Sequence, residues 1–403
     1  MASMNLWLRV FLPFAVGYYL SYFLRNANAV IAPVLSNELA LSPADLGLLT
    51  STYLLVFGAF QIPLGILLDR YGPRKVEAGL LLIAAAGAGL FALGRDLTEL
   101  ALARGLIGLG VSACLMASFK GFLQWFPLEK QASLTGAIMA AGGLGALTAS
   151  VPLELALPIL GWRGAFIVLA VAALAAAAFI FFSLPAQDAS VQADSLKEQL
   201  SSVLEIFRDR RFWRFAPQMA LFPGAFMALQ GLWAVPWLMN VSGASRAVAA
   251  EHLLAMGLAM LACNLGVATL ATRLARAGIQ PIMLLSGGSA LALACEAVII
   301  LGLGPTLPLW AGFALFVSTG TLAYALLAAM FPPALSGRVT TALNLLAFVG
   351  AFGLQWGIGL VVGGLLALGL EAATAYRTSF GVMFLMQASA YAWFVLEGRR
   401  KAV

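Results

Sequence analysis

Charged side chains are scarce in this 403-residue chain, at 10% of all residues, whereas hydrophobic residues make up 62%. A water-soluble protein of this length needs many more polar side chains to cover its surface, so the composition excludes a soluble globular fold. The apolar residues form continuous runs instead of alternating with polar ones, which excludes a transmembrane β-barrel. The composition therefore predicts an all-α integral membrane protein, whose helices each use about 20 residues to cross the bilayer.

Cysteine and histidine are also nearly absent, and so are the motifs of common enzymes. The three cysteines lie scattered in apolar segments, an arrangement that argues against a disulfide framework. The chain has neither the H-E-x-x-H of metalloproteases nor the P-loop G-x-x-x-x-G-K-[ST]. Its formal charge of +6 does not indicate nucleic-acid binding, because the cations gather at the ends of apolar segments, where membrane insertion explains them. We therefore expect no enzyme, no cofactor and no nucleic-acid partner.

The apolar segments predict twelve transmembrane helices in two sets of six. The expected spans are 7–32, 45–68, 76–94, 99–122, 131–156, 164–184, 212–239, 248–271, 280–302, 306–330, 339–366 and 377–396. One long polar interval separates the two sets. We predict an N-terminal six-helix bundle over residues 1–186, a cytoplasmic linker over 187–211 and a C-terminal bundle over 212–403.

The positions of the lysines and arginines predict the orientation of the chain. With the N-terminus inside, 16 of the 23 cations fall in cytoplasmic segments and 4 in external ones. Cytoplasmic loops carry such an excess of cations, so both termini should be cytoplasmic. We expect a monomeric multi-pass protein of a bacterial inner membrane, whose partners are the lipid bilayer and a small-molecule or ion substrate.

The two sets of spans resemble repeats of one another. Trp125-Phe126-Pro127 opens the fifth span and Met330-Phe331-Pro332 opens the eleventh. The offset of 205 residues between them also pairs Gly145 with Gly350. A second pair of similar segments opens the sixth and twelfth spans. Two matches at corresponding places favour a duplication, which makes the predicted bundles pseudo-symmetric.

The loop between the second and third spans, GILLDRYGPRK, joins two apolar segments with glycines and cations. It resembles the signature G-x-x-x-D-[RK]-x-G-x-[RK]-[RK] of the major facilitator superfamily. The matching positions are Gly65, Asp69, Arg70, Gly72, Arg74 and Lys75. In that family the corresponding aspartate helps to lock the cytoplasmic side between the bundles. From the residues alone, a positive-inside loop of any membrane protein is the alternative.

The fourth span carries a second family-like motif. Leu100 to Gly110 resembles l-x-x-x-R-x-x-q-G-x-g, with Arg104 at its arginine. The arginine of this motif is often linked to proton coupling, and structural hydrogen bonding is the alternative role for Arg104. Together the two motifs imply a secondary transporter in which two six-helix bundles alternate access to a central site.

Charges inside the bilayer are costly, so each is a candidate functional residue. Arg25 shares one face of the first span with Tyr18, Tyr22 and Asn26. A guanidinium beside phenols can hold a carboxylate or a similar anion. The stretch from Tyr22 onward also resembles the first helix of anion-transporting branches of the family. The alternative is that Arg25 extends to the outer interface.

Four further residues are candidate substrate contacts. Lys120 lies near the cytoplasmic end of the fourth span, where extension of its amino group to the interface is the alternative. Gln230 and Trp233 on the seventh span and Tyr324 on the tenth could line the site. These positions suit neutral hydrogen bonding to a polar substrate.

Acidic residues are absent from the interior of the first, fourth, seventh and tenth spans, which line the cavity in this family. A cavity with cations and without acids attracts anions. Glu154 and Glu296 are the best-embedded acids that we identify, and either could carry a coupled proton or pair with an arginine. We therefore predict proton-coupled uptake of a small organic or inorganic anion.

Two rival transport functions remain, and a third rival, a membrane enzyme or receptor, is disfavoured by the paired six-helix halves. His252, Met256 and Met227 carry soft ligand atoms that suit Cu(I), and His-x-x-x-Met on the eighth span resembles a copper-importing branch of the family. In an apolar protein, however, methionines usually pack in the core. The other rival is a drug or metabolite exporter. It is disfavoured because the fifth span has Ala149-Ser150 where multidrug antiporters of the family have Gly-Pro.

Overall fold

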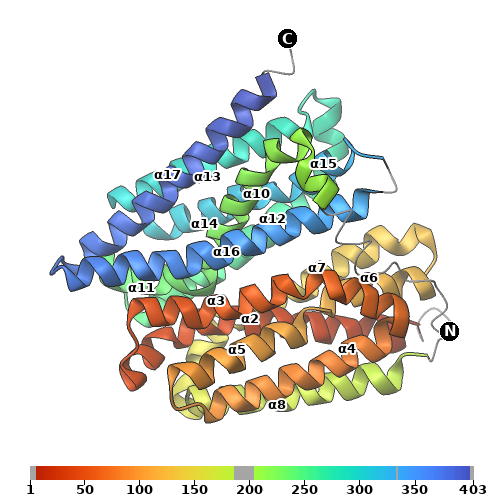
Figure 1. Cartoon of the computed structure of the whole chain (residues 1–403), viewed down its shortest axis with the longest axis horizontal. Coiled ribbons are helices and arrows are strands. Elements are labelled where there is room, and N and C mark those ends of the chain that lie inside the picture. Colours follow the sequence, from red (N-terminus) through yellow and green to blue (C-terminus); the bar gives the residue numbers. More distant parts are fainter. Residues whose placement is uncertain (1–5, 186–203, 333–334, 400–403) are drawn as a thin grey trace. The chain divides into compact units, whose positions relative to one another are not determined.

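The computed structural model describes residues 6–185, 204–332 and 335–399, which are helical almost throughout and contain no strand (Figure 1). Most of the predicted linker over 187–211, namely residues 187–203, lies outside these residues. The chain divides into two compact units. Unit 1 comprises residues 1–41 and 52–198, and unit 2 comprises 42–51 and 199–403.

Unit 1 is a bundle of helices that follow one another through short turns. Its elements are η1 (Trp7–Phe11), α2 (Leu12–Leu39), α4 (Gln61–Leu93), α5 (Leu97–Val111), α6 (Cys114–Trp125), η2 (Leu128–Lys130), α7 (Gln131–Thr148) and α8 (Val151–Ser183), and α3 (Pro43–Ala59) is shared with unit 2. In Figure 1 the long helix α4 lies along α5 and α8. The Asp96 side chain caps α5 by accepting from the Glu99 amide, as expected of an aspartate before a helix.

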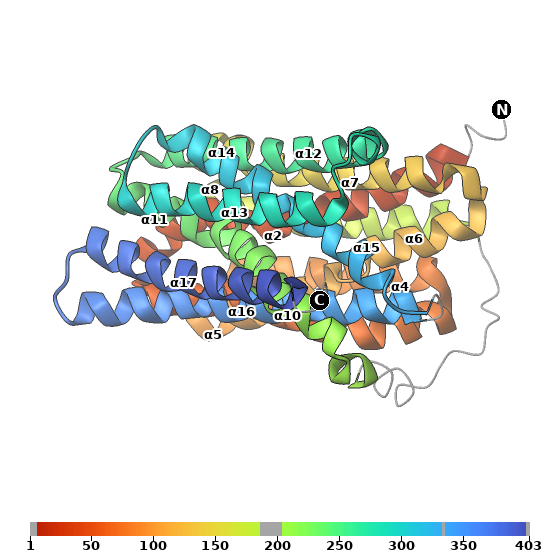
Figure 2. The ribbon, with the colours of Figure 1, turned by 90° about the horizontal axis from the view of Figure 1, so that it is seen from above.

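Unit 2 repeats this plan with more interruptions. Its elements are α10 (Arg210–Ala228), η3 (Leu229–Trp233), α11 (Ala234–Val241), α12 (Arg246–Arg276), α13 (Pro281–Leu301), α14 (Thr306–Val317), η4 (Ser318–Thr321), α15 (Leu322–Ala328), α16 (Ser336–Ala367) and α17 (Ala372–Arg399). Figure 2 shows α10 crossing beside α16 and α17, which it contacts. Pro217 and Pro223 lie inside α10, and a π-helical turn, η3, follows it.

Ten helices in the described part of the chain are long and apolar enough to cross a membrane. Two of them, α4 and α8, each run through a glycine with left-handed backbone, Gly72 at φ 76° and Gly161 at φ 63°. Glycine tolerates this conformation because it has no Cβ. The twelve predicted segments exceed these ten by two. The predicted second span comprises α3 and the part of α4 before Gly72, and the predicted fifth span comprises α7, a shorter apolar helix, and the part of α8 before Gly161.

Each unit has a close helix contact at a glycine, and the two contacts occupy corresponding places in the sequence. In unit 1, Gly145 of α7 lies against the carbonyl of Tyr19 on α2. In unit 2, Gly350 of α16 lies against the carbonyl of Ala220 on α10. These are the two glycines that the offset of 205 residues pairs in the sequence. Small residues at such points let membrane helices approach closely, and here they do so at matching places.

Candidate functional site

Arg25 projects from α2 into a group of aromatic rings within unit 1. Its guanidinium carbon lies 4.9 Å from the ring centre of Tyr22, 5.0 Å from that of Phe57 and 5.9 Å from that of Tyr53. Cations are attracted to ring faces at these distances. The side chain is half-buried, so it stays reachable by a ligand. Sequence reasoning missed Tyr53 and Phe57, because nothing local links the second span to Arg25.

The other predicted residues of the first span surround this guanidinium. The rings of Tyr18 and Tyr22 meet edge to face at 5.1 Å. The Tyr18 hydroxyl donates to the sulfur of Met139 at 3.8 Å, whereas Asn26 donates its side-chain amide to the Tyr22 carbonyl at 2.8 Å. Gly142 of α7 leaves the space that the two tyrosine rings fill.

Arg104 lies directly behind this group and is completely buried. Its Nη1 donates to the carbonyl oxygen of Leu24 at 2.9 Å, and its guanidinium carbon lies 5.1 Å from the Tyr53 ring. Leu24 precedes Arg25 in the chain, so Arg104 fixes the backbone from which Arg25 projects. Tyr53 is within reach of both guanidinium groups, which concentrates positive charge around one ring.

Lys120 of α6 forms an ion pair with Asp69, the aspartate of the signature segment. The two side chains are 26% and 42% exposed, so the pair lies at the edge of unit 1. The structure therefore gives the predicted substrate contact Lys120 an internal partner. In the same segment, Arg74 donates from Nε to the Phe181 carbonyl at 2.7 Å, and Arg70 lies 5.4 Å from the Tyr71 ring.

We expect substitution of Lys120 by methionine to leave substrate affinity within about two-fold of wild type and to lower stability by no more than about 1 kcal/mol, since partly exposed ion pairs contribute little. Uptake kinetics and thermal unfolding of the purified protein measure the two effects. The charge-swapped double variant Lys120→Asp/Asp69→Lys serves as control and should recover the lost stability. A large loss of affinity at unchanged stability would instead establish Lys120 as a ligand.

Three embedded acids differ in their surroundings. Glu296 of α13 is buried and accepts a hydrogen bond from the Gln387 amide at 2.7 Å. Glu154, in the first turn of α8, is half-buried. Glu77 of α4 is completely buried, and sequence reasoning missed it. It lies two residues after Lys75 of the signature segment, at the start of the predicted third span, and α4 continues beyond it into the core.

A sequence model of the Major Facilitator Superfamily matches residues 14–353. The chain belongs to the Major Facilitator Superfamily. This agrees with the helical bundles, the signature segment and Arg104, and it makes the protein a membrane transporter rather than an enzyme. The predicted family and fold class are thereby confirmed.

Relatives of this facilitator are named as transporters of sulfoacetate and of hexuronate. It is 30% identical over 185 residues to a probable sulfoacetate transporter of Cupriavidus necator, a match that covers 45% of this chain and 43% of the relative. It is 28% identical over 219 residues to the hexuronate transporter of Escherichia coli, covering 50% of each. The chain thus matches about half the length of these relatives. A bacterial homologue of the human lysosomal transporter Spinster, solved inward-facing and occupied, has a TM-score of 0.77 at 17% identity, covering 97% of this chain and 96% of that one.

In unit 2 of the facilitator, two of the predicted contacts serve its own packing. Trp233 is completely buried and donates its indole N–H to the Gln355 carbonyl at 2.8 Å. Gln230 is buried in the same π-helical turn, η3. Tyr324 is half-buried and donates its hydroxyl to the side-chain oxygen of Asn344 at 3.2 Å. Of these predicted residues, Tyr324 is therefore the most exposed to a substrate.

The predicted metal ligands are engaged otherwise. The Nδ1 of His252 lies 2.8 Å from the Val248 carbonyl, which can only accept, so Nδ1 carries the proton. Nε2 then accepts from the Thr306 hydroxyl at 3.0 Å. Neither nitrogen keeps a free lone pair, and Met256 is fully buried. Within the described residues no three His, Cys, Asp or Glu side chains cluster. Met227 lies on α10, whereas His252 and Met256 lie on α12.

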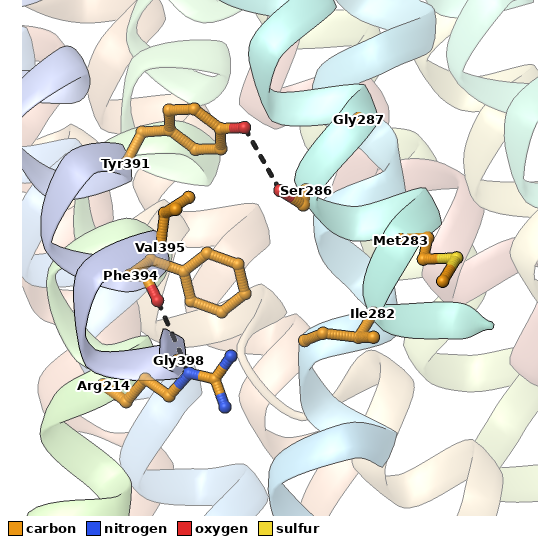
Figure 3. A pocket seen from close by; sticks show the side chains of 9 residues that line it. All are labelled: Arg214, Ile282, Met283, Ser286, Gly287, Tyr391, Phe394, Val395 and Gly398. Atoms are coloured by element: carbon orange, nitrogen blue, oxygen red, sulfur yellow. Dashed lines mark hydrogen bonds between the residues drawn. The ribbon is translucent and has the colours of Figure 1, made fainter. Parts of the chain in front are cut away.

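A separate cavity of about 400 Å³ lies in unit 2 between α10, α13 and α17 (Figure 3). Arg214 lies at one end of it, with Nε 3.5 Å from the Phe394 carbonyl. Ser286 and Tyr391 share a hydrogen bond of 3.1 Å across it. None of the predicted substrate contacts lines this cavity. It is therefore distinct from the group around Arg25.

Proposed function

We propose that this facilitator takes up a small organic anion together with protons, and that Arg25 binds the anionic group. The observation that carries the proposal is the half-buried guanidinium of Arg25 among the rings of Tyr22, Tyr53 and Phe57. Arginine presents paired N–H donors that match a carboxylate or sulfonate. Arg104 supports it from behind with a second positive charge.

The names of the relatives supply the substrate class. Hexuronates and sulfoacetate are both small organic anions, and neither is a cation or an apolar drug. A positive site attracts such molecules. We further propose alternating access between the two bundles, a bacterial inner membrane and cytoplasmic termini. The excess of cations in the predicted cytoplasmic segments supports this orientation.

The proposal is tested with a matched pair of sugars. D-galacturonate and D-galactose share their ring and differ in a carboxylate, so only the acid engages Arg25. Purified protein should be stabilised by D-galacturonate or sulfoacetate, by about 2.7 kcal/mol at a hundred times the Kd, and not by D-galactose. Equal stabilisation by D-galacturonate and D-galactose would contradict anion recognition. So would a lack of stabilisation by both D-galacturonate and sulfoacetate. Uptake into proteoliposomes with and without a proton gradient then tests the coupling.

A further inference from the structure

Glu77 occupies an interior position in unit 1 where four helices meet. It lies on α4 with none of its surface exposed. Its Oε1 fills the space beside Gly17 of α2, where a Cβ would collide with it, and Ile180 of α8 lies at the same point. The Cys114 thiol of α6 is its polar neighbour. Glycine at position 17 thus makes room for a carboxyl group inside the bundle.

Among the residues that the structure describes, no cation compensates this carboxyl group directly. Neither of its oxygens has a well-formed hydrogen bond within the described residues, and a thiol is only a weak donor. Of the titratable groups on the packed helices, Cys114 is the one beside it, and α8 contributes the apolar Ile180. An ionised carboxylate that is buried without a partner loses its hydration at a large cost in free energy. The buried carboxyl group of Glu77 is therefore a candidate functional group.

The contact with Gly17 places Glu77 against the helix that carries the proposed anion site. Gly17 directly precedes Tyr18, and Arg25 lies about two helical turns further along α2. A change of charge at Glu77 acts on the anion site across this apolar interior. Loss of one negative charge there favours a bound anion, and by reciprocity a bound anion favours protonation of Glu77.

We propose that Glu77 is the residue that carries the coupled proton in this facilitator. This inference rests on the proposed function. It assigns to Glu77 the proton-carrying role that the sequence predicted for Glu154 or Glu296. The carboxylate takes one proton from water on the side where substrate enters, becomes a neutral carboxylic acid while buried, and returns the proton to water on the other side. No other bond changes. A proton neutralises the carboxylate and removes the free-energy cost of its desolvation. Uptake of the proton and uptake of the anion are thereby coupled.

The first test is independent of any substrate. Infrared difference spectra of the purified protein, recorded across a pH titration, detect the carbonyl band of a protonated carboxylic acid. Wild type should show this band, and Glu77→Gln, which keeps the shape but cannot ionise, should lack it. Glu154→Gln and Glu296→Gln are the matched controls and should retain the Glu77 component. A spectrum unchanged in Glu77→Gln would overturn the proposal, even if no tested sugar acid or sulfonate is transported.

The second test separates exchange from uphill transport in proteoliposomes loaded with D-galacturonate or sulfoacetate. Glu77→Gln should exchange substrate within about three-fold of the wild-type rate, but should not accumulate it in response to a proton gradient. Glu77→Asp, which remains ionisable, should accumulate substrate with a shifted pH profile. Accumulation by Glu77→Gln at the wild-type level overturns the role. So does an equal loss of exchange and accumulation in both variants, because it would indicate a packing function.

Discussion

Arg25→Gln is expected to lower the affinity of the facilitator for D-galacturonate or sulfoacetate by at least about 100-fold, equal to about 2.8 kcal/mol. Glutamine keeps a polar side chain but removes the charge and the paired donors that hold a carboxylate. Hydrogen bonds to charged groups contribute about 1.5–3 kcal/mol each, so the loss of a two-point contact accounts for this size. Thermal shift with increasing ligand and the KM of uptake both measure it.

Arg25→Lys separates charge from geometry. It retains the positive charge without the planar fork, so we expect a weaker effect of about ten-fold. Arg163→Gln is the matched control in the same unit, because its guanidinium pairs with Glu38 and donates to the Gly94 carbonyl. The control should bind substrate normally. If Arg25→Gln bound D-galacturonate as tightly as wild type does, Arg25 would not be the anion contact.

The part of the site that lies on one helix could be predicted from sequence. Tyr18, Tyr22 and Arg25 share a face because helical spacing is local, and the structure brings these three side chains together. The rings of Tyr53 and Phe57 come from another helix, so their approach depends on tertiary packing that no spacing encodes. The sequence therefore predicts Arg25 as a candidate site residue but does not identify the rings of Tyr53 and Phe57 beside it.

Lys120 and Glu77 show the same division between local sequence and packing. Lys120 was expected near a substrate because a cation in an apolar span suggests function, but its partner Asp69 lies 51 residues away in the chain. Glu77 was overlooked because it lies close to the cations Arg74 and Lys75 at the start of a predicted span, although its neighbours in space are Gly17, Ile180 and Cys114. In both cases the local sequence describes the helix end, whereas packing decides whether the side chain reaches water or the interior.

The duplication read from the sequence leads to the second large effect. Gly145→Ala and Gly350→Ala are each expected to destabilise the protein by about 2 kcal/mol or more, in the range of overpacked cores. A Cβ at Gly145 would meet the Tyr19 carbonyl, with its carbon 3.0 Å away, and a Cβ at Gly350 would meet the Ala220 carbonyl. Both obstacles are backbone atoms of a packed helix, which cannot rotate away as a side chain could.

Matched glycines on the same two helices give the opposite sign. Gly136 of α7 and Gly353 of α16 have nothing within 4 Å of a Cβ. Alanine there should raise stability by about 0.5–1 kcal/mol, because glycine loses more backbone entropy in a helix. Thermal unfolding of the four detergent-purified variants therefore separates the effect of a close helix contact from the general effect of replacing glycine by alanine. If Gly145→Ala and Gly350→Ala were as stable as Gly136→Ala and Gly353→Ala, the close contacts would not support the bundles. If only one of the first pair were destabilised, the two halves would not share the packing that a common origin implies.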